Sequence, residues 1–264
     1  MGGLPRSGNT LLSSILNQNP NISTTAPSII ADVYNRLHSL RFTEQYISFP
    51  DSNSLDNIFS SVLDSYYKDW DSNYIIDRGN TWGTPGNMEM LKKYCPNKIK
   101  IICTVRDVLD VLVSYWKLKP TDVMNDIEND KRSGRFYSYK SEQEILCEYL
   151  MNPGGTIDRV LFSFYNLIQN YDTTTYHFVE YEDLVLNTRE TIEGIYKFLD
   201  IELYEHDYDN ISQFERNGIV YDDTFFGVEW HKLRSKISLN KNNVRDYFSD
   251  KIINKYSNLE LWRD

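Results

Sequence analysis

Apolar residues follow two alternating spacings along this chain. Apolar residues three or four positions apart predict amphipathic helices, whereas short continuous apolar runs predict buried strands. The predicted helices cover residues 11–18, 28–41, 53–70, 86–94, 107–117, 141–171 with a break near 153–155, 188–199 and 244–262. The predicted strands cover residues 74–77, 98–105 and 176–181. This alternation predicts an α/β fold with a doubly wound parallel sheet flanked by helices.

Two stretches show neither spacing. Residues 119–140 carry mixed charges and few apolar side chains, which predicts a mobile loop. Residues 203–264 form a C-terminal extension that is polar and irregular up to the last predicted helix. No internal repeat is visible, and 264 residues suit one α/β domain, so we expect residues 1–264 to form a single domain.

A loop framed by Gly3 and Gly8 precedes the first predicted helix. Its spacing is that of the phosphate-binding motif G-x-x-x-x-G-K-[ST], but Asn9 stands in the lysine position and Arg6 lies inside the loop. Backbone N–H groups of such a loop and of the helix start point at a bound anion. The alternative is a chance match in a Gly/Ser-rich turn, because short motifs recur without function.

The loop favours a three-layer architecture like that of the P-loop NTPases, in which a buried strand comes directly before the loop. Only Met1 and Gly2 precede the loop in this sequence. We therefore expect the first strand to be missing or truncated, and the natural polypeptide to begin upstream of Met1.

A second candidate anion site follows the clearest predicted strand. Arg106 ends the apolar run over 98–105, so it should emerge at the carboxyl edge of the sheet, where ligands of such folds bind. Ser114 lies eight residues further on, about two helical turns along the next helix. A guanidinium and a hydroxyl in this arrangement can hold one phosphate. The alternative is that Arg106 pairs with Asp107 or Asp110 and that Ser114 only packs.

The charge balance narrows the range of partners. The net charge is −10, which argues against nucleic acid as the main partner, because phosphate backbones need clustered Lys and Arg. It also favours a neutral glycan, a lipid or a small molecule over an acidic peptide. Three cysteines without metal-ligand spacing fit a reducing compartment, and no apolar run reaches about 18 residues, so we expect a soluble cytoplasmic protein.

Three motifs in this order resemble those of the sulfotransferases, which transfer a sulfuryl group from 3′-phosphoadenosine 5′-phosphosulfate (PAPS). They are the loop over residues 4–11, the run Val105-Arg106-Asp107 followed by Ser114, and residues 181–184, which read Tyr-Glu-Asp-Leu. The resemblance spans about residues 3–200. An arginine rather than a lysine in the loop is more similar to the bacterial and tyrosylprotein branches than to the cytosolic steroid and phenol branch.

The resemblance implies a role for each motif. The loop corresponds to the 5′-phosphosulfate site, the second motif to the 3′-phosphate site, and the third motif places a tyrosine near the adenine. The implied cofactor-binding residues are Arg6, Ser7, Gly8, Asn9, Thr10, Leu11, Arg106, Ser114 and Tyr181. A late basic segment commonly closes over the nucleotide, which makes Arg234 and Lys236 candidates, the alternative being a solvated basic face. No metal is expected.

The same resemblance suggests which residues take part in catalysis. Arg6 would stabilise the leaving phosphate, and Arg78, just after the strand over 74–77, would contact the transferring group. The alternative for Arg78 is an ion pair with Asp77. Asp32 and His38 are candidates for the general base, because they follow the first helix, where related enzymes often place an acid. Each of the two is alternatively a solvated or packing residue.

Two other functions compete with a PAPS-dependent sulfotransferase. The first is a P-loop kinase or other nucleotide phosphotransferase, which would need Mg²⁺ and ATP. Asn9 in the lysine position and Arg106 at the strand end argue against this function. The second is a catalytically degenerate nucleotide-binding module, which would bind the nucleotide without turnover.

Overall fold

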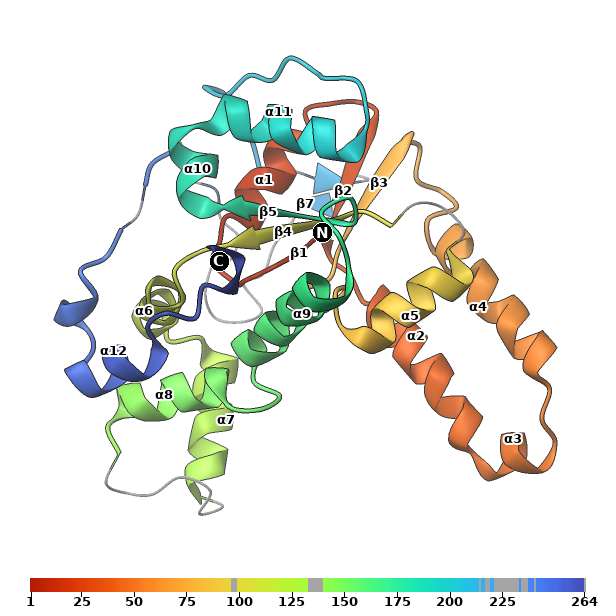
Figure 1. Cartoon of the computed structure of the whole chain (residues 1–264), viewed down its shortest axis with the longest axis horizontal. Helices are drawn as coiled ribbons and strands as arrows, with labels where there is room; N and C mark the ends of the chain where they lie inside the picture. Colours follow the sequence, from red (N-terminus) through yellow and green to blue (C-terminus); the bar gives the residue numbers. More distant parts are fainter. Residues whose placement is uncertain are drawn as a thin grey trace.

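The computed structural model describes residues 1–95, 99–132, 140–213, 215–216, 219–220, 233, 237–239 and 241–263. Its centre is a set of short parallel strands (Figure 1). Strand β4 (Ile101–Val105) pairs with β1 (Gly2–Gly3) on one side and with β5 (Tyr176–Glu180) on the other. A second parallel pair joins β2 (Ile22–Pro27) to β3 (Tyr74–Arg78).

Backbone hydrogen bonds of Met1 connect the two sets of strands. The Met1 amine donates to the Asp77 carbonyl, and the Gly79 N–H donates to the Met1 carbonyl at 3.0 Å. This is the pattern of a parallel ladder, so the strands follow the order β2-β3-β1-β4-β5. The predicted parallel sheet is confirmed, and the first strand is present as the two-residue β1. The loops after β1 and β4 lead to opposite sides of the sheet, which makes their carboxyl ends the switch point where ligands bind.

Helices cover both faces of these strands. On one face lie α1 (Asn9–Leu16), α10 (Tyr181–Leu186) and α11 (Thr188–Leu199), whose buried side chains pack with Ile102 (Figure 1). On the other face, Ile101, Cys103 and Val105 pack with a larger set of helices. These are α2 (Ile30–Ser39), α4 (Ser52–Tyr66), α5 (Pro85–Tyr94), α6 (Val108–Leu118), α8 (Glu142–Met151), α9 (Thr156–Asn170) and α12 (Asp250–Tyr256). Because neighbouring residues of β4 point to opposite faces, the strand is buried on both and the fold has three layers.

The structure corrects the prediction of a loop over residues 119–140. Helix α7 (Thr121–Arg132) occupies much of that range. Val123 and Ile127 lie four residues apart and are both buried in the larger core. The Tyr149 hydroxyl of α8 adds a hydrogen bond to Asp126 at 2.7 Å. Two apolar residues on one face are enough to dock this polar helix, and so few apolar positions gave no helical periodicity in the sequence.

The last predicted helix is shorter than residues 244–262. The structure divides that range into a 3-10 turn η3 (Val244–Asp246), the helix α12 and a second 3-10 turn η4 (Leu261–Arg263). Asn258 has a left-handed φ of 61°, which an α-helix does not allow, and α12 therefore ends before it. The predicted Arg234 and Lys236 lie outside the described residues.

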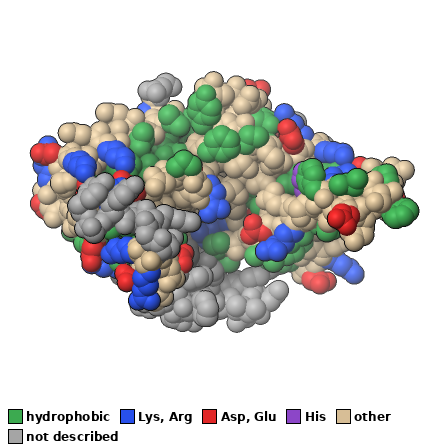
Figure 2. Space-filling model, turned by 90° about the horizontal axis from the view of Figure 1, so that it is seen from below, with side chains coloured by type: hydrophobic (Ala, Val, Ile, Leu, Met, Phe, Trp, Pro, Cys, Tyr) green, Lys and Arg blue, Asp and Glu red, His purple; other side chains and the backbone are tan. Residues whose placement is uncertain are grey.

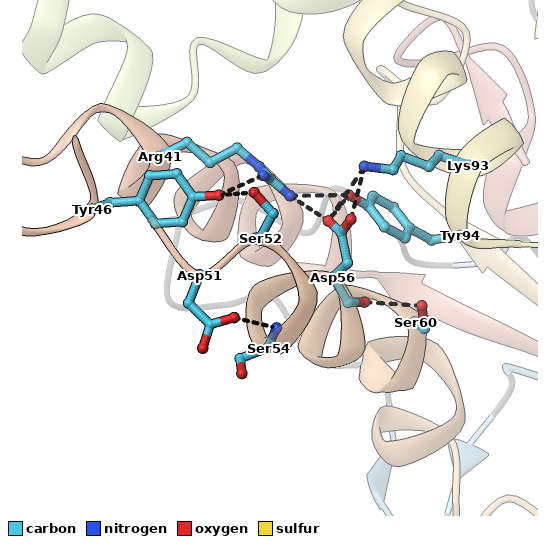
Figure 3. A network of polar contacts seen from close by, with 9 residues as sticks. All are labelled: Arg41, Tyr46, Asp51, Ser52, Ser54, Asp56, Ser60, Lys93 and Tyr94. Atoms are coloured by element: carbon cyan, nitrogen blue, oxygen red, sulfur yellow. Dashed lines mark hydrogen bonds and ion pairs between the residues drawn. The ribbon is translucent and has the colours of Figure 1, made fainter. Parts of the chain in front are cut away.

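A helical lobe projects from one side of the sheet (Figure 1). It consists of α2, the 3-10 turn η1 (Leu40–Phe42), α3 (Glu44–Ser48) and α4. The Asp56 carboxylate joins the lobe to α5, because it pairs with Arg41 and accepts bonds from Tyr94 at 2.7 Å and Lys93 at 3.1 Å (Figure 3). The hydrogen bond from Tyr94, followed by that from Lys93, lowers the pKa of Asp56 to about 2. Hydrophobic side chains lie exposed at the far end of the lobe (Figure 2), among them Phe42, Ile47 and Phe49.

Candidate functional site

The loop after β1 leaves the sheet in close contact with β4. The Leu4 N–H donates to the Thr104 carbonyl at 2.9 Å. A Cβ atom at Gly3 would lie 2.0 Å from the Thr104 hydroxyl and 2.9 Å from the Asn9 side chain. Only glycine fits at this position, because the two segments pack together without space for a side chain. The first glycine of the motif therefore sets how closely the loop approaches β4.

The loop itself has the backbone form of an anion cradle. Arg6 and Gly8 both adopt left-handed conformations, with φ of 65° and 87°. A backbone that alternates in this way turns successive N–H groups toward one concave surface. Helix α1 begins directly afterwards at Asn9, and its first N–H groups have no acceptors within the helix. The loop and the helix start together present N–H groups that can bind an anion such as a phosphate.

The side chains of Ser7 and Asn9 point into the base of the loop. The Ser7 hydroxyl is fully buried, donates to the Leu4 carbonyl at 2.6 Å and lies 2.7 Å from the Thr104 hydroxyl. The Asn9 amide donates to the same Leu4 carbonyl at 2.9 Å and accepts a bond from the Thr104 hydroxyl at 2.8 Å. These two side chains hold the loop in shape, so the groups that they can offer to an anion are their backbone N–H groups.

Four side chains from distant parts of the sequence meet beside the loop. Arg6 donates from Nε to the Ser114 hydroxyl at 3.1 Å. Arg106 donates from Nη1 to the Arg6 carbonyl at 3.2 Å, and its guanidinium lies 4.4 Å from the centre of the Tyr181 ring. Tyr181 also packs on the loop, because a Cβ atom at Gly8 would lie 3.2 Å from its ring. The three motifs that the sequence analysis selected thus form one cluster at the carboxyl ends of β1, β4 and β5.

Arg106 is buried and has an acidic partner on the next helical turn. Its Nη2 atom lies 3.4 Å from Oδ2 of Asp110, which is equally buried. Asp107 has a different role, because its carboxylate accepts the Asp110 N–H at 3.0 Å and caps α6. Of the two partners that the sequence offered, Asp110 is the one that pairs with Arg106. The ion pair and the contact with Tyr181 are compatible, since they use the edge and the face of one guanidinium.

The end of β3 brings Arg78 to the same edge of the sheet. Arg78 is buried, its N–H donates to the Thr25 hydroxyl at 2.7 Å, and its carbonyl accepts from Ser28 at 2.8 Å. The neighbouring Asp77 carboxylate accepts bonds from the Tyr67 hydroxyl and from the Trp82 indole. Burial, followed by the negative charge of Asp77, raises the pKa of Tyr67, so the phenol keeps its proton and remains a donor.

The two candidate bases occupy opposite ends of α2. Asp32 lies exposed in the first turn, just beyond the carboxyl end of β2. His38 lies exposed in the last turn, and its ring packs against Phe42 with 5.5 Å between ring centres. Their separation of six positions corresponds to about 9 Å along the helix axis. Asp32 is therefore the candidate nearer to the strand ends. Thr10 and Leu11 lie half-buried in the first turn of α1.

Two residues of this cluster were not selected as functional from the sequence. Thr104 braces the loop, and Asp110 orients Arg106. The signal for Thr104 was one hydroxyl inside an otherwise apolar strand. The signal for Asp110 was an acid four residues after Arg106 on the apolar helix α6, a spacing that brings two side chains together.

The described residues contain neither a cluster of metal ligands nor a membrane-spanning helix. No group of three or more His, Cys, Asp or Glu side chains is placed to hold a metal ion there. In that same part of the chain, none of the helices combines the length and the apolar composition that crossing a bilayer requires.

Comparisons with known proteins place this site in a family. No curated protein matches the chain. Solved structures that resemble it at low identity include three sulfotransferases. A sulfotransferase domain from the curacin biosynthetic pathway is 14% identical, with a TM-score of 0.47 and coverage of 77% of this chain and 76% of that one. A sulfotransferase domain from the Synechococcus PCC 7002 olefin synthase is 17% identical, with a TM-score of 0.48 and coverage of 88% and 86%. Mouse sulfotransferase SULT7A1, complexed with PAP, is 15% identical, with a TM-score of 0.49 and coverage of 97% and 80%.

The family assignment rests on the match to a family model. The model of the sulfotransferase domain matches residues 1–259, which is nearly the whole chain. The predictions of the family, of its P-loop-like α/β fold and of a PAPS-dependent enzyme are confirmed by this match. The chain belongs to the sulfotransferase family.

Proposed function

We propose that this chain transfers the sulfuryl group of PAPS to a hydroxyl or amine of an acceptor by in-line displacement, with the residues of the cluster around Arg106 binding the donor. The observation that carries the proposal is the convergence of the loop, Ser114 and Tyr181 on Arg106. PAPS carries a phosphosulfate at one end and a 3′-phosphate at the other. Two adjacent cationic sites beside an aromatic ring match that charge distribution.

Each end of the donor has a set of residues suited to it. The cradle formed by the N–H groups of Ser7 to Thr10, together with Arg6, suits the phosphosulfate. Arg106 and the Ser114 hydroxyl suit the 3′-phosphate, because guanidinium groups bind phosphates with paired, charge-assisted hydrogen bonds. Tyr181, whose ring lies 4.4 Å from the Arg106 guanidinium, suits the adenine end of the donor, because aromatic rings pack against one another.

The reaction breaks one S–O bond and forms another. The bond from sulfur to the bridging phosphate oxygen breaks, the acceptor oxygen or nitrogen bonds to sulfur, and the acceptor proton passes to a base. Negative charge grows on the leaving phosphate, where Arg6 and the cradle N–H groups stabilise it. Arg78 supplies positive charge toward the transferring group from the end of β3. Asp32 is the base that we propose, because it lies exposed at this edge of the sheet.

We also propose whether the reaction needs a metal, which class of acceptor it uses and where in the cell it takes place. Three arginines supply the positive charge that a magnesium ion supplies in phosphotransferases, so we expect turnover without a metal. The net charge of −10 favours a neutral glycan, a lipid or a small molecule as the acceptor over an acidic peptide. The cysteines Cys95, Cys103 and Cys147 are free thiols, which fits a reducing, cytoplasmic location.

Calorimetric titration with 3′-phosphoadenosine 5′-phosphate (PAP), in parallel with ATP and with or without Mg²⁺, tests the proposal. We expect PAP to bind without metal, and Arg106→Ala to weaken it about 10- to 150-fold, because a hydrogen-bonded charge contributes about 1.5–3 kcal/mol. Arg132→Ala is the matched control, since Arg132 is an exposed arginine paired with Glu128.

Three outcomes would contradict the proposal in different ways. Binding of ATP only in the presence of Mg²⁺ would favour a kinase. Binding of PAP without transfer of labelled sulfuryl from PAPS to any of a panel of phenols, glycans and lipids would favour a nucleotide-binding module. Equal loss of PAP binding in the Arg106 and Arg132 variants would contradict the assignment of the 3′-phosphate site to Arg106.

A further inference from the structure

The Asp110 carboxylate connects the nucleotide site to the C-terminal part of the chain. Its Oδ2 atom lies 3.4 Å from Nη2 of Arg106. Its Oδ1 atom accepts two bonds from Asn242, one from the backbone N–H and one from the side-chain amide, both at 3.4 Å. The Asn242 side chain also accepts a bond from Lys117 at 3.2 Å. One buried carboxylate thus bonds to a phosphate-binding arginine with one oxygen and to the C-terminal segment with the other.

The segment that Asp110 holds is short and well defined. It runs over residues 241–248 and includes the turn η3, with Phe248 buried in the larger core. In the sequence it follows the basic residues Arg234 and Lys236 within a few positions. Asn242 is therefore one point at which this part of the chain is bonded to α6, at a residue one helical turn after Arg106.

The hydrogen bonds and the ion pair of Asp110 are long enough that they can shorten. Distances of 3.4 Å are at the long end of the range for hydrogen bonds. A phosphate that draws Arg106 into a fixed orientation also fixes Asp110, and through Asp110 it fixes Asn242.

We propose that Asp110 is a positioning residue that couples binding of the 3′-phosphate at Arg106 to ordering of residues 241–248. The inference rests on the proposed function, because it assumes that Arg106 binds the 3′-phosphate of the donor. Coupling of this kind acts in both directions: the 3′-phosphate protects the segment, and the fastened segment strengthens binding of the 3′-phosphate. Asp110 itself touches neither the nucleotide nor the reacting atoms.

The affinity test compares two nucleotides that differ only in the 3′-phosphate. We expect Asn242→Ala to raise the Kd for PAP about 5- to 20-fold, within the usual range of coupling between sites, and to leave the Kd for adenosine 5′-phosphate unchanged. Asn243→Ala is the matched control, because Asn243 is an exposed neighbour that bonds only to Asp246 among the residues that the structure describes.

The exchange test isolates Asp110. Saturating PAP should slow hydrogen exchange in residues 241–248 of the natural chain and of the Asn243→Ala variant. In Asp110→Asn the amide can still accept from Asn242 but loses the ion pair with Arg106. PAP should therefore bind to this variant at saturation without slowing exchange in residues 241–248.

The outcomes separate this inference from the proposed function. If the natural chain does not bind PAP, the proposed function fails and the inference fails with it. If the natural chain binds PAP while Asn242→Ala binds it equally well, the coupling alone is overturned. Equal weakening of PAP and adenosine 5′-phosphate, or continued protection of the segment in Asp110→Asn, would also overturn it. The test does not depend on the folding of one variant, because Asn242 is only half-buried.

Discussion

Replacing Ser7 with alanine distinguishes a serine that binds the anion from a serine that holds the loop. In the structure the Ser7 hydroxyl is fully buried against Leu4 and Thr104. Its removal leaves no partner unsatisfied, because Asn9 still donates to the Leu4 carbonyl and still accepts from the Thr104 hydroxyl. The cost is then one or two hydrogen bonds, about 1–2 kcal/mol of the free energy of unfolding. For a chain of this size that lowers the melting temperature by about 2–8 °C.

Urea unfolding followed by tryptophan fluorescence measures this loss, and calorimetric titration with PAP measures affinity in the same variant. We expect the Kd for PAP to change by less than about threefold, because the backbone N–H groups of the cradle are kept. Ser14→Ala is the matched control, since the Ser14 hydroxyl is buried in the following helix α1 without a hydrogen-bond partner among the described residues. That variant should unfold at nearly the same urea concentration as the natural chain.

The opposite result would refute the reasoning. If Ser7 donated its hydroxyl to the phosphosulfate, Ser7→Ala would weaken PAP binding by about tenfold or more, as expected for a lost hydrogen bond to a charged group. Stability would then change little. That combination would mean that the side chain turns out of the loop base and that the contacts with Leu4 and Thr104 do not form in the working site.

Three further predictions concern other parts of the site and the fold. Gly8→Ala should lower both stability and PAP affinity, because the φ of Gly8 is 87° and the new Cβ would meet two side chains within 3.2 Å. Gly86→Ala is the control, because a Cβ atom there meets nothing within 4 Å. Thermal melting measures stability, and calorimetric titration with PAP measures affinity. Asp32→Asn should lower the kcat for sulfuryl transfer about 10²- to 10⁴-fold, while His38→Asn should not, and the reverse order would move the base to His38. Burial lowers the pKa of His206, so below about pH 6.5 the unfolded chain binds more protons than the folded chain. The free energy of unfolding should therefore fall as the pH drops below that value. Urea unfolding between about pH 5 and 8 should show a smaller fall in His206→Gln.

The site motifs could be found from the sequence because each lies at the end of a strong local pattern. The apolar run that became β4 ends at Arg106, so the strand and the edge on which the arginine emerges were both predictable. The glycine frame of the loop and the helix behind it were predictable for the same reason. The local pattern could not predict which of these segments lie close together in space. Arg6 bonds to Ser114 across 108 residues of sequence, and that contact depends on the parallel pairing of β1 with β4.

Strand β2 was missed because its buried residues are largely polar. Ser23, Thr24 and Thr25 are buried there, where a sequence pattern expects apolar side chains. Their polar groups are matched by partners elsewhere in the chain: Thr24 donates its N–H to Asn17 at 2.7 Å, and the Thr25 hydroxyl accepts from Arg78 at 2.7 Å. A buried polar strand is stable when such bonds form, but those bonds are tertiary and leave no periodic signal.

The orientation of side chains within the loop was also beyond the sequence. The resemblance to sulfotransferases implied that Ser7 and Asn9 bind the donor, and residue type alone is consistent with that role. Their inward orientation comes from Thr104, whose hydroxyl lies between them and belongs to a strand almost one hundred residues away. Local sequence contains no information about which hydroxyl β4 places against the loop.

The residue in the lysine position explains why this loop suits a sulfuryl donor. Asn9 both donates to Leu4 and accepts from Thr104, whereas a lysine has donors only and could not accept the Thr104 bond. The position that carries the cation in a phosphotransferase loop is thus used here to fasten the loop to β4. The positive charge comes instead from Arg6, which bonds to Ser114 and whose carbonyl accepts from Arg106. The two proposed anion sites are therefore parts of one hydrogen-bonded unit. A ligand with two separate anionic groups fits that unit better than a triphosphate, whose charge lies in one chain.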